Sequence, residues 1–178
     1  MKILVAVSLA FFLSLTAWSQ KFSLEKSHVK FFSSAPLEDI TAENSKSSSI
    51  LNEATGEVVF SIPMQEFQFA KSLMKEHFNE KYMESEKFPK ATFQGKISDF
   101  KTDATGTQNV TASGKLLIHG VTRDVQIPGT IEKANNKITV KAKFMVKLED
   151  YKITRPQLLW KNIAEEVEVT VEFNYVPL

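Results

Sequence analysis

Strict alternation of apolar and polar residues is the feature of this 178-residue chain that most constrains its fold. Near the C-terminus the apolar members of the alternation are Val167, Val169, Val171, Phe173 and Tyr175. An earlier stretch repeats the pattern, with Ile138, Val140, Ala142, Phe144, Val146 and Leu148 in one phase. A period of two with one apolar face indicates antiparallel strands that are buried on one side and solvated on the other.

Strand-like composition continues through most of the chain. Further strands are expected at about 22–33, 38–46, 56–69, 91–100, 108–119 and 121–132. Turn residues separate several of them, at Thr55-Gly56, Thr105-Gly106, His119-Gly120 and Asn135-Asn136. The sequence therefore predicts an all-β domain of about eight antiparallel strands. Such a set either closes into a barrel around a cavity or packs as a filled sandwich or barrel.

Two local features interrupt the alternation. Between Ala70 and Ser85 the apolar residues recur at helical spacing, which predicts one short helix that ends before Pro89. Between Met64 and Phe67 the apolar phase changes, which predicts a β-bulge near Pro63 to Glu66. The serines 47–49 are interpreted as a loop or a polar strand face.

The N-terminus has the pattern of a secretory signal peptide. Lys2 precedes the mostly apolar run Ile3–Leu15, and Ala17 and Ser19 are small residues placed for cleavage before Gln20. The alternative is a transmembrane anchor, but the run is shorter than the roughly 20 apolar residues that a spanning helix needs. We therefore expect a cleaved signal at residues 1–19, one domain at residues 20–178, and a periplasmic or secreted protein.

Composition excludes several classes of function. The chain has 22 basic and 21 acidic residues and no cysteine. Near-zero net charge argues against nucleic-acid binding, and without cysteine there is no disulfide, thiol nucleophile or Cys-based zinc site. The three histidines, His28, His77 and His119, fall on separate elements, so no metal is expected. We expect no cofactor and no catalytic residues, because nucleophile-elbow and phosphate-loop motifs are absent.

Lys141, Lys143 and Lys147 share one face of an expected strand. The simplest interpretation is a solvated strand face. The alternative is a contact for the diphosphate of a ligand or for an anionic membrane surface.

Two segments resemble the YceI-like family, which is named for its polyisoprenoid-binding periplasmic members. Residues 77–95 read HFNEKYMESEKFPKATFQG, and residues 114–125 read GKLLIHGVTRDV. The first is similar to the Pro-x-x-x-Phe step that follows the helix in that family, and the second is similar to its central Gly-Val-Thr hairpin. The order of elements agrees over essentially the whole chain after residue 19, although residues 70–78 depart from the pattern of better-known members.

The resemblance implies an eight-stranded, lipocalin-like antiparallel β-barrel with one short helical insertion. In that family the lumen holds a long apolar chain, such as a polyisoprenoid or another long-chain lipid. The residues we expect to line the lumen are Phe60, Phe67, Phe69, Phe93, Val140, Phe144, Val169 and Phe173. A flap over one end would present Leu73, Met74 and Phe78, with Met74 and Met83 as gate residues. Ordinary core packing is the alternative for each of them.

Two functions of different class follow from this sequence. The first is a non-enzymatic carrier that holds a long polyisoprenoid or fatty-acyl lipid for storage or transport. The second is a filled barrel that acts as an envelope stress or protein-interaction module without a lipid ligand. An enzyme of unrecognised type is a third alternative. Edge strands can pair, so a homodimer is left open, as is transient contact with a membrane.

Overall fold

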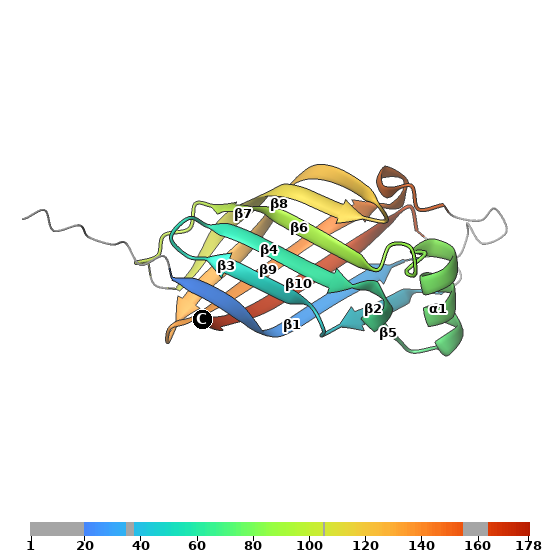
Figure 1. Cartoon of the computed structure of the whole chain (residues 1–178), viewed down its shortest axis with the longest axis horizontal. Coiled ribbons are helices and arrows are strands. Elements are labelled where there is room, and N and C mark those ends of the chain that lie inside the picture. The colour runs from blue at the N-terminus through green and yellow to red at the C-terminus, as the bar shows by residue number, and fades with distance from the viewer. Residues whose placement is uncertain (1–19, 35–37, 105, 155–163) are drawn as a thin grey trace, which may run out of the picture.

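The computed structural model describes residues 20–34, 38–104, 106–154 and 164–178, which form one β-barrel (Figure 1). Its strands are β1 (Lys21–Ser33), β2 (Ile40–Asn44), β3 (Ser48–Asn52), β4 (Glu57–Pro63), β5 (Gln68–Phe69), β6 (Lys90–Ser98), β7 (Gly106–Ile118), β8 (Val121–Ala134), β9 (Lys137–Lys147) and β10 (Glu166–Pro177). The helical segments are η1 (Met64–Glu66), α1 (Ser72–His77), η2 (Phe78–Tyr82) and η3 (Leu148–Tyr151).

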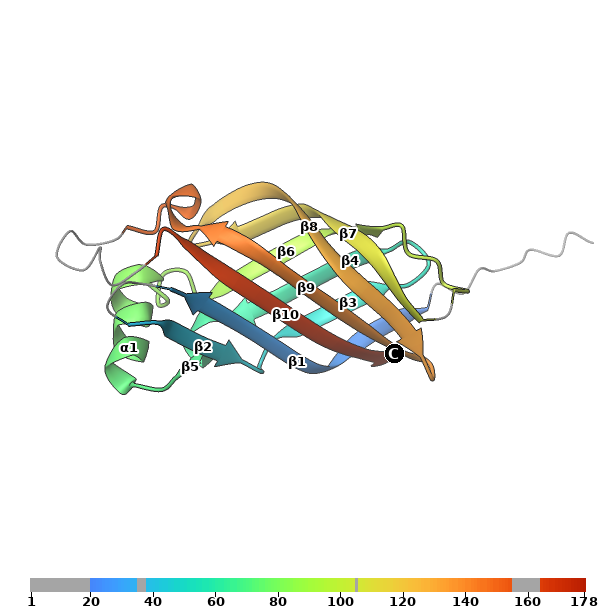
Figure 2. The same cartoon turned by 180° about the vertical axis from the view of Figure 1, so that it is seen from behind.

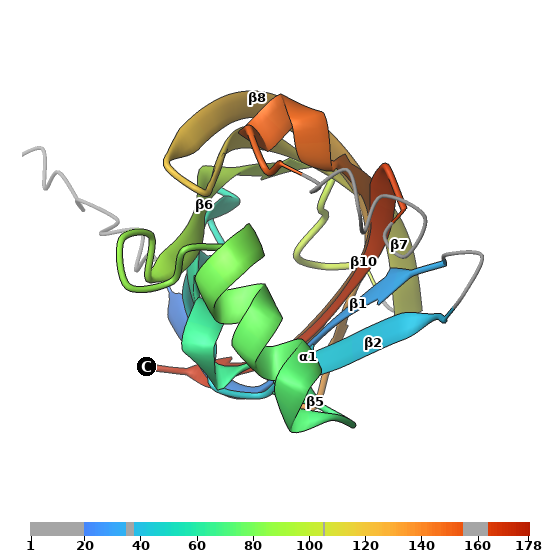
Figure 3. The same cartoon turned by 90° about the vertical axis from the view of Figure 1, so that its right-hand side faces the viewer.

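Eight antiparallel strands close the barrel, as the sequence predicts. The ring runs β1-β3-β4-β6-β7-β8-β9-β10 and closes where β10 pairs with β1 over most of both strands (Figure 2). β2 and β5 extend the sheet beyond β1 at one end, beside α1. Viewed along the barrel, α1 lies across the opening at that end (Figure 3). The fold thus gives the barrel one end with a helix over it and one end without.

The strand expected at 38–46 is β2, and a second short strand that was not expected, β3, follows it after a break. β2 and β3 pair with β1 in a common register, with Asn44 opposite Val29 and Leu51 opposite Phe22. Residues 45–47 interrupt the strand, and the fully buried Asn44 secures the break. Its Nδ2 donates to the carbonyl of Pro63 at 2.8 Å, and its Oδ1 accepts from the backbone N–H of Lys46 at 2.8 Å.

The expected bulge at Pro63 to Glu66 is a single 3₁₀ turn instead, η1. Proline cannot donate a hydrogen bond to a neighbouring strand, so pairing between β4 and β6 ends at Pro63. The chain then resumes as β5, which pairs with β2. The turn changes the phase of the apolar alternation between β4 and Phe67, which is the change that the predicted bulge was meant to explain.

The predicted helix forms between residues 70 and 85 and has two parts. α1 covers Ser72–His77 and continues into the π-helical turn η2, where the N–H of Met83 reaches back to the carbonyl of Phe78 at 2.8 Å. Asn79 stabilises the junction, because its Nδ2 donates to the carbonyl of Lys75 at 2.8 Å and its Oδ1 accepts from Ser85 Oγ at 2.7 Å.

The predicted turns occur at the described positions. Gly56, Gly120, Asn135 and Asn136 all have positive φ, which glycine and asparagine adopt most readily. Thr105 lies outside the described residues. These turns set strand lengths, and so they determine which residues reach each end of the barrel.

The barrel wall is incompletely paired between β8 and β9. Their hydrogen-bonded register covers only Gly129–Ala134 against Lys137–Ala142. Near α1, η3 lies against both strands: Arg123 Nε donates to the carbonyl of Asp150 at 3.0 Å, and His119 Nδ1 lies 3.1 Å from the carbonyl oxygen of Tyr151. η3 thereby covers the part of the wall where β8 and β9 are unpaired.

Candidate ligand-binding cavity

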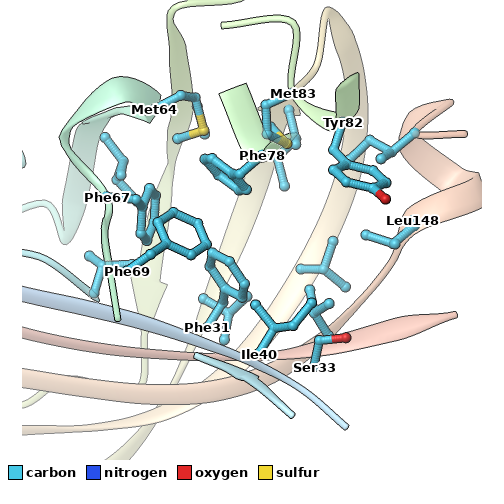
Figure 4. A pocket seen from close by; sticks show the side chains of 18 of the residues that line it. Phe31, Ser33, Ile40, Met64, Phe67, Phe69, Phe78, Tyr82, Met83 and Leu148 are labelled. Carbon is cyan, nitrogen blue, oxygen red and sulfur yellow. The ribbon is translucent and has the colours of Figure 1, made fainter. Parts of the chain in front are cut away.

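The barrel contains a cavity of about 390 Å³ at the α1 end. The strand residues that line it come from β2, β5 and the α1-proximal parts of β1, β4, β6, β7, β9 and β10, and helical and loop residues complete it (Figure 4). Its apolar lining residues are Val29, Phe31, Ile40, Phe60, Ile62, Met64, Phe67, Phe69, Met74, Phe78, Met83, Ala91, Leu116, Ile118, Phe144, Val146, Leu148, Ile153, Val167, Val169 and Val171. The volume falls within the range of about 300–1,000 Å³ that is typical of small-molecule pockets.

Four phenylalanines form one aromatic cluster between the wall and the helical segment (Figure 4). Phe78, from η2, stacks on Phe31 at 5.4 Å between ring centroids and meets Phe67 at 5.5 Å and Phe69 at 5.1 Å. Aromatic pairs at such distances contribute about 0.5–1.5 kcal/mol each beyond the area they bury. The cluster therefore attaches the helical segment to the barrel while its rings line the cavity.

A second aromatic cluster lies deeper in the barrel. Phe60 lines the cavity, stacks on Phe93 at 5.2 Å and meets Phe173 edge-on at 5.6 Å. Phe93 and Phe173 are each only 2% exposed and do not line the cavity. This group, which we call the Phe floor, separates the cavity from the rest of the interior.

The polar lining residues are Ser33, Glu38, His77 and Tyr82. They come from the end of β1, the segment just before β2 and the helical segment, which all lie at the α1 end. Ser33 Oγ accepts a hydrogen bond from the N–H of Ala164 at 3.1 Å, and Glu38 pairs with Lys71. Burial raises the pKa of the Tyr82 hydroxyl above its ordinary value of 10.0. Among the described residues, the polar side chains that line the cavity thus lie at its mouth.

Seven of the eleven residues that the sequence singled out line the cavity: Phe60, Phe67, Phe69, Met74, Phe78, Phe144 and Val169. Phe60 and Phe67 both do so because η1 lies between them. Met83, expected as a gate residue beside Met74, also lines it.

The other four are placed elsewhere. Phe93 and Phe173 belong to the Phe floor, and Val140 packs against the core deeper in the barrel. Leu73 is 58% exposed, because it lies on the outer face of α1. The alternation also contains residues that we did not single out, including Phe31 in phase with Val29 and Val171 in phase with Val169.

Lys141, Lys143 and Lys147, which we call the basic strip, face solvent and are paired with carboxylates. Lys141 lies 3.3 Å from Glu172, Lys143 lies 2.9 Å from Glu168, and Lys147 lies 3.5 Å from Glu149. None of the three lysines lines the cavity. This arrangement favours a solvated strand face over a contact for a ligand diphosphate.

The described ranges contain no group of three or more His, Cys, Asp or Glu side chains that could hold a metal ion. None of their helical segments has the length and hydrophobicity that a membrane crossing requires.

Comparison with known proteins agrees with this geometry. A polyisoprenoid-binding domain from Saccharophagus degradans is 18% identical with a TM-score of 0.76, and the match covers 88% of this chain and 98% of that one. BcnA from Burkholderia cenocepacia is 18% identical with a TM-score of 0.71, and the match covers 83% and 95%. The search of curated proteins gave no match. The family profile described as a YceI-like domain matches residues 20–175, and the chain therefore belongs to the YceI-like family.

Proposed function

We propose that this chain is a non-enzymatic lipid-binding protein that holds the hydrocarbon part of a polyisoprenoid or fatty-acyl compound in the cavity beneath α1, for storage or transport. The observation that carries the proposal is the cavity wall. In the described part of the chain its side chains are hydrocarbon, thioether or phenyl except for Ser33, Glu38, His77 and Tyr82. The ligand named for the Saccharophagus degradans domain, a polyisoprenoid, supports this ligand class.

Burial of apolar surface supplies the binding energy. Ten buried methylenes gain roughly 8 kcal/mol at about 0.8 kcal/mol each. Association costs at least about 4 kcal/mol of that gain in lost freedom of motion. A chain of about ten carbons or more is therefore needed for useful affinity, and a cavity of about 390 Å³ has room for one.

We propose that movement of the helical segment, residues 70–85, widens the mouth of the cavity and lets a ligand enter. Three groups of contacts hold the helical segment: the aromatic cluster at Phe78, the ion pair of Lys71 with Glu38, and the pair of Glu84 with His119 at 2.9 Å. The ion pairs are at the surface, where each contributes about 1 kcal/mol or less. The aromatic contacts therefore dominate the free energy of opening, and they are the contacts that a ligand would touch.

We also propose that the protein is exported and acts in the periplasm or outside the cell. The signal-like pattern of residues 1–19 supports this, as does the match to the family profile, which begins at Gln20. The full-length gene product, expressed in a bacterium with an envelope, should appear in the periplasmic or secreted fraction with Gln20 at its N-terminus by mass spectrometry. A membrane fraction that retains Met1 would contradict export by cleavage.

Native mass spectrometry of residues 20–178 tests the lipid proposal. The protein is purified without detergent from a bacterial envelope and measured before and after organic extraction. We expect a stoichiometric adduct that extracts as a prenyl or acyl lipid, and uptake of fatty acids or prenols by the extracted protein. A clean apo mass together with no uptake would refute the proposal and favour the interaction module.

A matched pair of variants locates the site. Val169→Trp places an indole in the cavity and should abolish uptake, because Val169 lines it. Thr170→Trp, one residue along β10, faces the opposite side of the strand and should bind as wild type. Equal loss in both variants would indicate damage to the barrel rather than blockage of the cavity.

A further inference from the structure

The cavity ends at one level around the barrel. Phe60 lines it on β4 while Val58 does not, and Ala91 lines it on β6 while Phe93 does not. The remaining strands agree, since the deepest lining residues are Val29 on β1, Leu116 on β7, Phe144 on β9 and Val171 on β10. On β10 the lining runs only from Val167 to Val171 of a strand of 12 residues, about 13 Å at 3.3 Å per step.

Small residues bring the rings of the Phe floor together below that level. Gly95 faces inward on β6, and a Cβ there would lie 2.6 Å from Cζ of Phe93. The ring of Phe93 therefore lies over Gly95, in space that any other residue would fill. The position of the Phe93 ring in the Phe floor therefore depends on the absence of a side chain at Gly95.

The interior below the floor is solid. Phe22, Leu51, Ile131 and Ile138 are fully buried there, and the Tyr175 hydroxyl is hydrogen-bonded to Ser49 Oγ at 2.7 Å. At the far end, Glu53 is 8% exposed and pairs with Lys133 from the opposite side of the barrel. A ligand chain that enters at the α1 end thus has no path through the barrel.

We infer that the cavity is blind and selects a single hydrocarbon chain of about a dozen carbons, inserted tail first, with its polar end among Ser33, Glu38, His77 and Tyr82. The inference rests on the proposed function. A methylene takes roughly the room of a water molecule, about 30 Å³, so 390 Å³ corresponds to about 13 carbons. The ligand class is then a medium-chain acyl compound or a prenyl chain of two or three isoprene units.

A chain-length series tests the limit. Extracted protein, residues 20–178, is titrated by displacement of a fluorescent fatty acid with saturated fatty acids of 8 to 20 carbons. Prenols of 10, 15, 20 and 40 or more carbons form a second series. Each added carbon should tighten binding about fourfold while it is buried. Beyond about 13 carbons the gain should stop, because further carbons remain outside the mouth.

Variants at Phe60 test the role of the floor in opposite directions. Phe60→Ala removes six ring carbons from the floor and should move the optimum to longer chains by up to about six carbons. Phe60→Trp should move it to shorter chains. Phe32→Ala is the matched control, since Phe32 is on the opposite strand face from Phe31 and does not line the cavity. Should Phe60→Ala fail to fold by circular dichroism, Phe60→Leu replaces it with the same direction of shift.

The outcomes separate the two proposals. A wild-type affinity that keeps rising fourfold per carbon through 20-carbon and longer chains would overturn the length limit and leave lipid binding intact. The same limit in wild type and in both Phe60 variants would overturn the role of the floor. Absence of binding at every chain length would refute the proposed function itself.

Discussion

The two halves of the barrel share one sequence pattern and have different interiors. In the half near α1, inward residues such as Ile62, Val169 and Val171 surround a cavity. In the far half, Phe22 and Tyr175 fill the space, and the small residues Gly95 and Gly114 face the same interior. Alternation makes a closed wall in both halves. The volume of the inward side chains, level by level, decides whether that wall encloses packed side chains or a cavity.

This difference predicts unequal costs of truncation, which is the largest effect we expect. Phe173→Ala removes a ring packed against Phe60 and Tyr175 and should lower the free energy of unfolding by about 3–5 kcal/mol. Val169→Ala, four residues nearer the mouth, borders an existing cavity and should cost less than about 1.5 kcal/mol. Urea unfolding of both variants measures the contrast, and similar costs would mean that the near half is also packed.

A substitution at Gly95 tests whether the far half has spare room. Gly95→Ala should destabilise the fold by about 1–3 kcal/mol, because its Cβ meets both Phe93 and the β7 backbone. Lys96→Ala, at the next and exposed position, should stay within about 0.5 kcal/mol of wild type. Thermal unfolding of the pair is sufficient, and an unchanged melting temperature for Gly95→Ala would disprove tight packing at the floor.

The buried hydroxyl of Tyr175 makes the stability of the far half sensitive to alkaline pH. Burial raises the pKa of Tyr175 above the value of 10.0 for an exposed tyrosine. The contribution of the neutral Tyr175 hydroxyl to the free energy of unfolding is therefore complete below pH 10. It decreases as the pH rises further, because Tyr175 then ionises only in the unfolded chain. Tyr175→Phe should cost about 1 kcal/mol at pH 7, from the lost bond to Ser49. Its stability should fall less than that of wild type above pH 10 in parallel urea titrations.

The smallest effect is expected on the outer surface. Lys143→Ala removes an exposed ion pair with Glu168 and should change stability by less than about 1 kcal/mol. Its fatty-acid affinity should equal that of wild type, because the pair lies outside the cavity. A loss of affinity for ligands with an anionic head in this variant alone would restore the diphosphate interpretation of the basic strip.

The sequence was sufficient for most of the strands, their inward faces and the helical segment, because each depends on local periodicity. It did not predict β3 or the division of 56–69 into β4 and β5. The sequence alone did not predict which inward residues line the cavity and which are packed in the core below it. Phe60 and Phe93 are directly opposite each other on β4 and β6, yet only Phe60 lines the cavity. That outcome depends on Gly95, which gives the Phe93 ring its place. The interruption between β2 and β3 depends similarly on Asn44 and Pro63, which are 19 residues apart.

The aromatic cluster of Phe31, Phe67, Phe69 and Phe78 attaches the helical segment and lines the cavity with the same rings. A ligand that touches Phe78 gains that contact only while the segment is closed, so occupancy and closure stabilise each other by the same free energy. The dissociation rate should then depend on chain length more steeply than the association rate does. A protein of this design would release its ligand slowly in water, and rapidly wherever a surface draws the helical segment away from the barrel.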